Sequence, residues 1–336
     1  MDMLSETLLV TLLVIWVLCC VLILFERRIY RNIIYFGIFS LIASLCYLLL
    51  GAPDVAMAEA GISVFATIFF IVCIEKSYSR QGGAVREKSE SMRRGRWIIK
   101  IAVPLVFSAG LFALFVRFMP DIPVNTYLKD QFLARFMTDV GGYNAVTAIL
   151  LGYRVYDTLF EALILVVSVV AVAHMSWAEE LSVPDGRHSE IENSNMAVFT
   201  MRIICPIILI FGAYLILNGH VAAGGGFLGG VAISTFFICR YYIYGIYDMP
   251  VKKVMRMEEL VFIYFTLMAV LFVTLIGANI YLPSDFAEVY QHLYLIIMNT
   301  LIGLKVACGF FIIFYRYVTV ERIEGELPAE EGGSQA

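Results

Sequence analysis

The sequence lacks the patterns that mark most soluble enzymes and nucleic-acid-binding proteins. Only 15% of its 336 residues are charged, the formal net charge is -4, and no strongly basic surface is indicated that would bind nucleic acid. None of the seven cysteines forms a Cys-x-x-Cys pair or a Cys/His cluster with zinc or iron–sulfur spacing. A Walker loop and a convincing internal repeat are also missing, so neither an ATPase nor an inverted-repeat carrier is indicated. We therefore expect no cofactor, redox centre or catalytic centre in this chain.

Hydrophobic residues are present in excess along the whole chain. They make up 61% of it, whereas a soluble domain is about 45–50% apolar. Because a membrane-spanning helix needs about 20 mostly apolar residues, we predict an all-α, polytopic protein of the lipid bilayer. The nine predicted spans are residues 5–25, 32–50, 55–75, 97–118, 155–175, 198–217, 225–244, 259–278 and 291–317.

The basic residues predict an orientation for these spans. With the N-terminus outside, 17 of the 24 Lys and Arg residues fall in inside segments and only three fall in outside segments. Positive residues accumulate on the cytoplasmic side, so we expect the N-terminus outside and the C-terminus inside. The first run opens with acidic residues and has no small-x-small cleavage site, which favours a span over a cleaved signal.

Two polar inserts divide the chain into three predicted blocks. We expect cytoplasmic linkers at 77–96 and 177–195 and a polar tail at 321–336. The blocks are a three-helix block at 1–80, a two-helix block at 97–176 and a four-helix block at 196–320. The apolar stretch 144–153 is predicted to be a short re-entrant or interfacial helix before the fifth span.

Glu59 is the first candidate functional residue, because a charge in hydrocarbon costs at least a few kcal/mol and usually faces protein or water. It lies five residues after Asp54, which can cap the third span. Small residues around Glu59 let neighbouring helices approach closely, so we expect it to face protein. It either titrates or binds a cation, or it pairs structurally with a basic residue.

Three further ionisable residues share one face of the fifth span. Arg154, Asp157 and Glu161 follow i, i+3, i+7 spacing, so Arg154 and Asp157 can pair locally. Glu161 then remains as a deeper carboxylate, with the Thr158 hydroxyl beside it. Such a group can exchange a proton or a metal ion, and the alternative is a salt-bridged helix start at the interface.

Lys305 is the deepest charge, near the middle of the last span and too far from its ends to snorkel comfortably. A buried lysine either pairs with a carboxylate or changes its protonation state, which would suit an ion path. Asn299 adds polar atoms on the same helix.

His220 and the glycines Gly224, Gly225 and Gly226 lie between the sixth and seventh spans. Such glycines permit irregular backbone whose carbonyls coordinate Na⁺ when they line a cavity. With Gly229 and Gly230, they also form two Gly-x-x-x-Gly motifs, which allow close packing of helices. His220 either relays protons or is structural.

These motifs resemble pieces of Mrp-type Na⁺/H⁺ antiporters. Gly51-Ala-Pro-Asp-Val-Ala-Met-Ala-Glu59-Ala resembles the C-terminal part of the large A subunit, and Arg154-x-x-Asp-Thr-Leu-x-Glu161 resembles the two-span segment that follows it. Membrane-bound hydrogenases carry these pieces as their small D and E subunits. His220-x-x-x-Gly-Gly-Gly-Phe-x-Gly-Gly resembles the signature of the MnhB-like B subunit, and Asn299-x-x-Ile-Gly-x-Lys305 resembles the last span of its hydrogenase version.

The resemblance implies a natural fusion of these pieces that contributes to the path of Na⁺ and H⁺. It implies Glu59, Asp157, Glu161 and Lys305 as ion-path residues, with Na⁺ bound transiently near Glu59 and Glu161 and no permanent metal. Three departures from the family pattern weaken the assignment of individual ion-coordinating residues: Ala58 for Thr, Gly152 for an acid, and Ala223 for Pro.

The same resemblance implies partners and a location. The partners are large antiporter subunits related to respiratory complex I, a small C-type subunit and, in a redox-driven complex, a hydrogenase or iron–sulfur arm. The membrane is the prokaryotic plasma membrane. The chain would then be a non-catalytic subunit of a membrane-bound oxidoreductase, because any redox chemistry lies in its partners. Two alternatives stay open, a stand-alone Mrp-type antiporter and a purely structural linker.

Overall fold

The computed structural model describes residues 3–26, 28–80, 106–117, 126–175, 195–244, 251–277 and 284–326, and all regular structure in these ranges is helical. They belong to two compact units, Met1–Arg80 with Phe136–Ala336, and Gln81–Arg135. The elements are α1 (Met3–Phe25), α2 (Ile29–Leu49), α3 (Pro53–Arg80), α5 (Tyr127–Asp139), α6 (Ala145–Ala148), the π-helix η2 (Ile149–Tyr153), α7 (Val155–Met175), α8 (Asn195–Asn218), α9 (Gly226–Tyr244), α10 (Val251–Gly277) and α11 (Ser284–Glu326).

Apolar helices occupy the positions of all nine predicted spans. Seven helices of the described ranges are long and apolar enough to cross a membrane. Two shorter apolar helices, Val106–Arg117 and Gly226–Tyr241, coincide with the predicted spans 97–118 and 225–244. The all-α, multi-pass prediction is thus confirmed. Most of both predicted linkers, residues 97–105, and the end of the tail lie outside the described residues.

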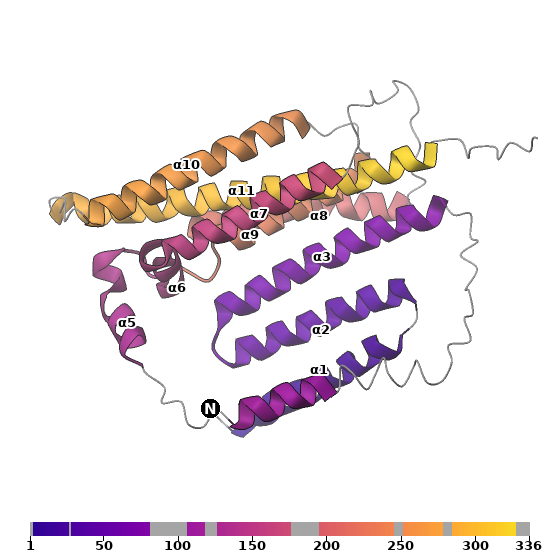
Figure 1. Cartoon of the computed structure of the whole chain (residues 1–336), viewed down its shortest axis with the longest axis horizontal. Helices are drawn as coiled ribbons and strands as arrows, with labels where there is room; N and C mark the ends of the chain where they lie inside the picture. The colour runs from indigo at the N-terminus through magenta and orange to yellow at the C-terminus, as the bar shows by residue number, and fades with distance from the viewer. Residues whose placement is uncertain are drawn as a thin grey trace, which may run out of the picture. The chain divides into compact units, whose positions relative to one another are not determined.

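Helix α11 is the centre of the larger unit. Of the membrane-crossing helices it is the most deeply buried, and it contacts α3, α7, α8, α9 and α10 (Figure 1). Helix α2 packs on α3, and α1 packs on α2. No residue of α1 is buried. The helices at the start of the chain therefore form successive layers on one side of α11.

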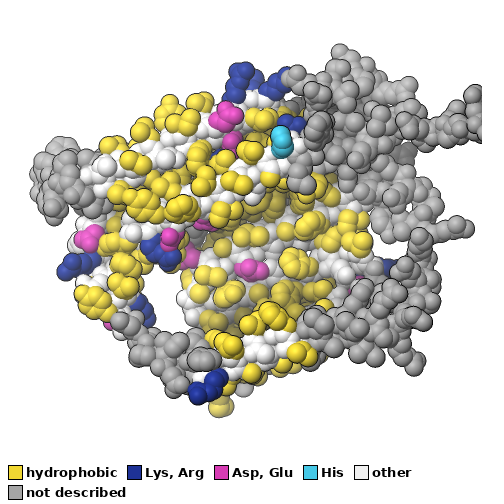
Figure 2. Space-filling view, viewed as in Figure 1, with side chains coloured by type: hydrophobic (Ala, Val, Ile, Leu, Met, Phe, Trp, Pro, Cys, Tyr) yellow, Lys and Arg dark blue, Asp and Glu magenta, His cyan; other side chains and the backbone are white. Residues whose placement is uncertain are grey.

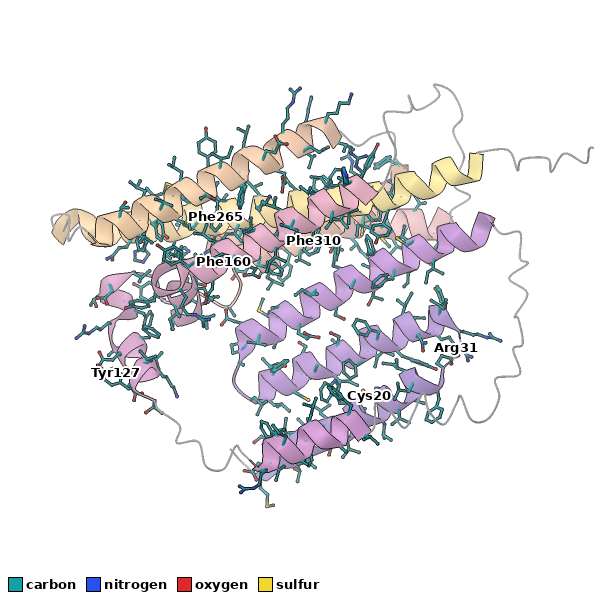
Figure 3. The ribbon with its side chains drawn as sticks, in the orientation of Figure 1. Cys20, Arg31, Tyr127, Phe160, Phe265 and Phe310 are labelled. Carbon is teal, nitrogen blue, oxygen red and sulfur yellow. The ribbon has the colours of Figure 1, made fainter. Side chains whose placement is uncertain are left out.

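Aromatic rings fill the core around α11. The Phe272 ring of α10 stacks on the Tyr294 ring with centroids 3.9 Å apart. Phe65 of α3 lies 4.7 Å from Phe310 of α11, and Phe265 is fully buried (Figure 3). Aromatic pairs of this kind add about 0.5–1.5 kcal/mol each beyond their burial. These contacts fix the neighbouring helices on α11.

Glycines allow α9 to approach α11 closely. A Cβ atom added to Gly230 would lie 2.5 Å from the Gly303 carbonyl oxygen and 2.7 Å from Val306 Cβ. A Cβ atom on Gly226 would lie 2.8 Å from Ile302 Cβ. The packing interpretation of the Gly-x-x-x-Gly motif therefore describes the contacts that these residues make.

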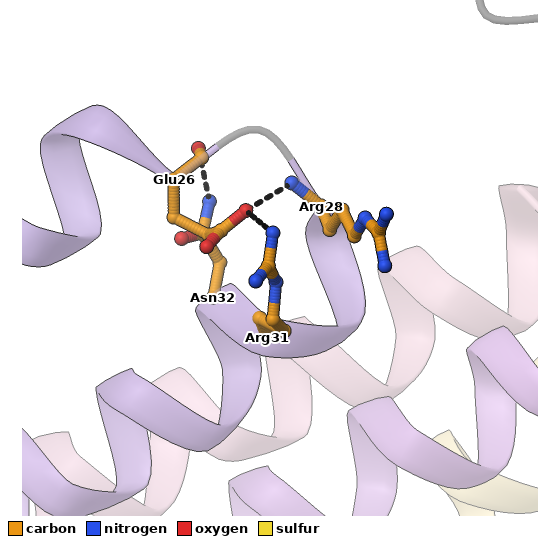
Figure 4. A network of polar contacts seen from close by, with 4 residues as sticks. All are labelled: Glu26, Arg28, Arg31 and Asn32. Atoms are coloured by element: carbon orange, nitrogen blue, oxygen red, sulfur yellow. Dashed lines mark hydrogen bonds and ion pairs between the residues drawn. The ribbon is translucent and has the colours of Figure 1, made fainter.

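The turn between α1 and α2 is closed by a polar network (Figure 4). Glu26 Oε1 accepts hydrogen bonds from the Arg28 backbone N–H at 2.9 Å and from Arg31 Nη2 at 2.8 Å. Asn32 Nδ2 donates to the Glu26 carbonyl oxygen at 3.3 Å. Within the basic cluster that follows the first span, Arg31 thus binds Glu26, the residue directly after α1, through its side chain, and Arg28 binds it through its backbone.

Substituting Gly230 with alanine should destabilise the protein. The added methyl group meets the backbone of α11, and overpacking of this kind costs about 1–3 kcal/mol. Thermal unfolding of the detergent-purified protein measures the effect. Gly110→Ala is the matched control, because its Cβ atom meets nothing within 4 Å and alanine favours a helix by about 1 kcal/mol over glycine. Equal melting temperatures for the two variants would contradict close packing of α9 on α11.

Candidate functional site

Asn144 lies at the centre of a polar cluster that joins segments far apart in the sequence. Its Nδ2 donates to Asp54 Oδ1 at 3.0 Å and to the Ala222 carbonyl oxygen at 2.9 Å. Thr147 Oγ1 donates to the Gly219 carbonyl oxygen at 2.7 Å. We call Asp54, Asn144, Thr147 and the loop 219–224 the clasp. The clasp connects the start of α3, the start of α6 and the loop between α8 and α9.

Asp54 and Gly224 take part in the clasp directly. The Gly224 backbone N–H donates to Asp54 Oδ1 at 3.3 Å, and the Gly224 backbone has a positive φ of 154°. The His220 carbonyl oxygen accepts from the backbone N–H groups of Tyr143 and Asn144 at 2.8 and 3.0 Å. Asp54 was expected to cap the third span, and the hydrogen bonds that its carboxylate accepts instead come from Asn144 and from the glycine loop.

His220 belongs to the same loop, outside the membrane-spanning helices. Its ring packs edge-on against the His292 ring with centroids 5.9 Å apart. Burial lowers the pKa of His220, and the neighbouring His292 acts in the same direction. The neutral ring of His220 is therefore favoured near pH 7.

The short apolar stretch before α7 forms the α-helix α6 followed directly by the π-helix η2. Asn144 Oδ1 caps α6 by accepting from the Val146 backbone N–H at 2.9 Å. The chain continues as the π-helix η2, and π-helical turns occur frequently at functional sites. Tyr294 of α11 donates its hydroxyl hydrogen to the Leu151 carbonyl oxygen at 2.9 Å. The predicted re-entrant or interfacial segment is thus helical and bound to α11.

Glu59 lies in α3 and is partly buried against α2. Ser40 of α2 donates a hydrogen bond to Glu59 Oε1. One turn away, Ser44 Oγ donates to the Ala56 carbonyl oxygen at 2.6 Å. On another side of α3, a Cβ atom on Gly61 would collide with the Leu228 side chain of α9. Glu59 accordingly faces protein, as the small residues around it predict.

Arg154, Asp157 and Glu161 are not equivalent. Arg154 Nε donates to Asp157 Oδ2 at 2.6 Å, and both side chains are exposed. Glu161 is also exposed, and no hydrogen bond or ion pair joins it to another described residue. Thr158 is buried and donates to the Leu150 carbonyl oxygen at 2.9 Å. The Thr158 hydroxyl thus binds the π-helix, whereas it was expected to accompany Glu161.

Lys305 forms a buried ion pair with Glu258 of α10. The two residues are 1% and 6% exposed, and the Lys305 Nζ lies 4.9 Å from the centre of the Phe262 ring. Sequence reasoning missed Glu258, although it named pairing with a carboxylate as one fate of Lys305. A signal was available: Glu258 lies directly before the eighth predicted span, 259–278, and at helical spacing from the buried residues Val254, Val261 and Phe265.

Asn299 and the glycines meet at the start of α9. Asn299 Oδ1 accepts from the Gly226 backbone N–H at 3.1 Å. Gly225 has a φ of 121°, in the region that glycine adopts most easily. Asn299 therefore satisfies a free backbone group at a helix start, which stabilises the junction between α9 and α11.

The candidate ion-path residues occupy separate places. Among the described residues no hydrogen bond or ion pair joins Glu59, Glu161 and Lys305 to one another. In the same ranges, no group of three or more His, Cys, Asp or Glu side chains is placed to hold a metal ion. The arrangement offers the hydrogen-bonded carboxylate of Glu59, the exposed carboxylates of Asp157 and Glu161, of which Asp157 pairs with Arg154, and the buried Lys305–Glu258 ion pair.

Two family models match the sequence. The MbhD model, which describes the D subunit of MBH, matches residues 7–78. The model described as a domain related to the MnhB subunit of Na⁺/H⁺ antiporter matches residues 196–312.

Curated relatives match over longer stretches. The chain is 24% identical over 251 residues to a Rhizobium meliloti (strain 1021) protein named as the A/B subunit of a K(+)/H(+) antiporter, and the match covers 68% of this chain and 25% of the relative. It is 30% identical over 159 residues to the antiporter subunit mnhA2 of Staphylococcus aureus (strain MRSA252), and this match covers 47% of this chain and 19% of the relative. The chain thus spans a quarter or less of the length of these relatives.

Two solved structures resemble the fold. A chain of the Mrp complex from Dietzia sp. DQ12-45-1b aligns with a TM-score of 0.70 at 19% identity, over 91% of this chain and 34% of that one. A chain of the membrane-bound sulfane sulfur reductase (MBS), an archaeal respiratory membrane complex, aligns with a TM-score of 0.50 at 27% identity, over 66% of this chain and 97% of that one. This chain is therefore a multi-pass membrane protein in which residues 7–78 match the MbhD model and residues 196–312 match the model related to the MnhB subunit of Na⁺/H⁺ antiporter.

Proposed function

We propose that this chain is a membrane subunit of a multisubunit Na⁺/H⁺ antiporter module and contributes residues to its ion path. The observation that carries the proposal is the Lys305–Glu258 pair, which is buried among helices of membrane-spanning length. An ionisable residue within a membrane-spanning segment is by default a candidate for a functional site, such as an ion path or a proton relay. The antiporter subunits among the relatives favour this interpretation over a purely structural linker.

The energetics of the Lys305–Glu258 pair favour a functional role. Replacing a buried ion pair by apolar residues of similar volume is often neutral or stabilises a protein by about 1–4 kcal/mol. The pair is therefore a poor device for stability alone. A lysine beside a carboxylate can instead change its charge state as ions pass, which is the role we propose for Lys305 and Glu258.

Glu59 is the second proposed ion-path residue. Its carboxylate lies between α2 and α3 with one hydrogen bond, from Ser40, and leaves further oxygen lone pairs for a proton or Na⁺. We assign the exposed Asp157 and Glu161 of α7 to the same path, with Na⁺ bound transiently near Glu59 and Glu161. The clasp, which includes Asp54 and Asn144, would hold α3, α6 and the glycine loop in register.

We also propose an organisation for the chain and its complex. The blocks 1–80, 97–176 and 196–320 correspond to three fused pieces, with the N-terminus outside and the C-terminus inside the prokaryotic plasma membrane. The partners are large antiporter subunits related to complex I and a small C-type subunit. The similarity to a chain of the sulfane sulfur reductase favours a redox-driven complex with an iron–sulfur or hydrogenase arm. A stand-alone antiporter is the alternative that the curated relatives support.

Replacing Glu59 with glutamine should reduce exchange without loss of assembly. The amide keeps the size of the side chain and can still bond to Ser40, but it no longer binds a proton or compensates Na⁺. We expect at least a tenfold lower rate of Na⁺-dependent proton movement in proteoliposomes of the tagged, purified complex. Glu259→Gln is the matched control, because Glu259 is exposed on α10. A wild-type rate in the assembled Glu59→Gln complex would remove Glu59 from the path.

Separating stability from transport requires a double substitution at the buried pair. Lys305→Met leaves Glu258 buried without a counter-charge, which should cost about 3–5 kcal/mol of stability. The double variant Lys305→Met with Glu258→Leu should regain most of that stability and still lack exchange. Thermal unfolding and the proteoliposome assay give the two readouts. Full exchange by the stable double variant would show that the pair is structural only.

A further inference from the structure

One face of α7 is exposed among the described residues of its own compact unit. Helix α7 packs on α11 and α10 through Val155, Ala162 and Val169. On its opposite side Phe160 is 63% exposed and Ile164 is 67% exposed. Figure 3 labels Phe160 on this helix, and the face of the molecule seen in Figure 2 is largely hydrophobic with a few acidic side chains among the hydrophobic ones.

Glu161 is on this same exposed face. It lies six residues after Val155, which is about 9 Å along the helix at 1.5 Å per residue. One turn before it, Asp157 is compensated by Arg154 at 2.5 Å. Glu161 has no such partner among the described residues. The exposed face of α7 therefore carries one net negative charge inside a helix of membrane-spanning length.

A lipid contact does not satisfy this charge. A carboxylate in hydrocarbon costs at least a few kcal/mol, and such residues usually face protein or water. The apolar residues on both sides of Glu161 also argue against a wide aqueous channel at this face. A neighbouring helix with one lysine or arginine at this depth would cover the apolar residues of the face and compensate the charge of the Glu161 carboxylate.

We propose that the α7 face formed by Asp157, Phe160, Glu161 and Ile164 is the docking surface for a membrane-spanning helix of another protein of the complex, which places a lysine or arginine opposite Glu161. A second copy of this chain does not meet that requirement. A two-fold contact through this face would bring Glu161 against Glu161, and like charges in an interface cost several kcal/mol.

The proposed contact follows from the position of Glu161 within a membrane-spanning helix, and it does not depend on antiport activity. It holds whether or not an ion passes Glu161, because the charge needs compensation in either case. Its failure is thus distinguishable from failure of the proposed function: cross-linking reports the interface, and the proteoliposome assay reports exchange.

Site-specific photo-cross-linking tests the docking surface in the native complex. A photoreactive phenylalanine analogue replaces Ile164 in the tagged full chain, and the cross-linked peptide is identified by mass spectrometry. We expect a membrane-spanning helix of a different protein, with a lysine or arginine within one turn of the cross-linked residue. Cross-links to lipid alone, to a second copy of this chain, or to a helix without a basic residue there would overturn the proposal.

Charge reversal tests the pairing itself. In the cross-linking chain, Glu161→Lys should lower the cross-link yield at least tenfold, and an acidic substitution of the partner's basic residue should restore it. Glu259→Lys on the exposed side of α10 is the matched control and should leave the yield unchanged. An undiminished yield in the Glu161→Lys chain, or a loss that the partner substitution does not rescue, would contradict a charge pair at this position.

Discussion

Charge compensation in an apolar medium is the constraint on which this structure depends most. Each ionisable residue in a helix of membrane-spanning length must find its counter-charge, a hydrogen-bond donor or water. Lys305 forms an ion pair with Glu258, and Arg154 forms one with Asp157. Glu59 accepts a hydrogen bond from the Ser40 hydroxyl. Glu161 is the exception among these residues, and we propose that a helix of a partner protein supplies its counter-charge. The same constraint thus accounts for both the internal packing and the proposed external contact.

Close packing and the clasp provide the framework for these charges. Glycines at Gly226 and Gly230 bring α9 against α11, which places Lys305 inside the helix bundle. The clasp joins the start of α3 to the loop 219–224 through Asn144, so segments separated by well over a hundred residues share one hydrogen-bonded cluster. A fused chain would keep these segments at equal stoichiometry, and the clasp would keep them in one relative position.

Much of the fold was predictable, because hydrophobic runs of about 20 residues follow from bilayer thickness alone. The burial of Lys305 and the protein-facing position of Glu59 were also predictable, from depth in a span and from small neighbours. The partner Glu258 was not identified, because pairing between distant helices depends on how they pack. The roles of Asn144 and Thr158 were missed for a similar reason, since both bind backbone carbonyls that carry no side-chain signature. The exposure of Glu161 likewise depends on which side of α7 meets α11.

The most direct test of the account is the composition of the complex that contains this chain. The tagged chain is extracted from native membranes with a gentle detergent, and the intact assembly is analysed by mass spectrometry. The account predicts a stable complex with large antiporter subunits, accompanied by iron–sulfur proteins if the complex is redox-driven. Recovery of the chain alone, from membranes in which other complexes remain intact, would contradict the account and indicate an independent carrier.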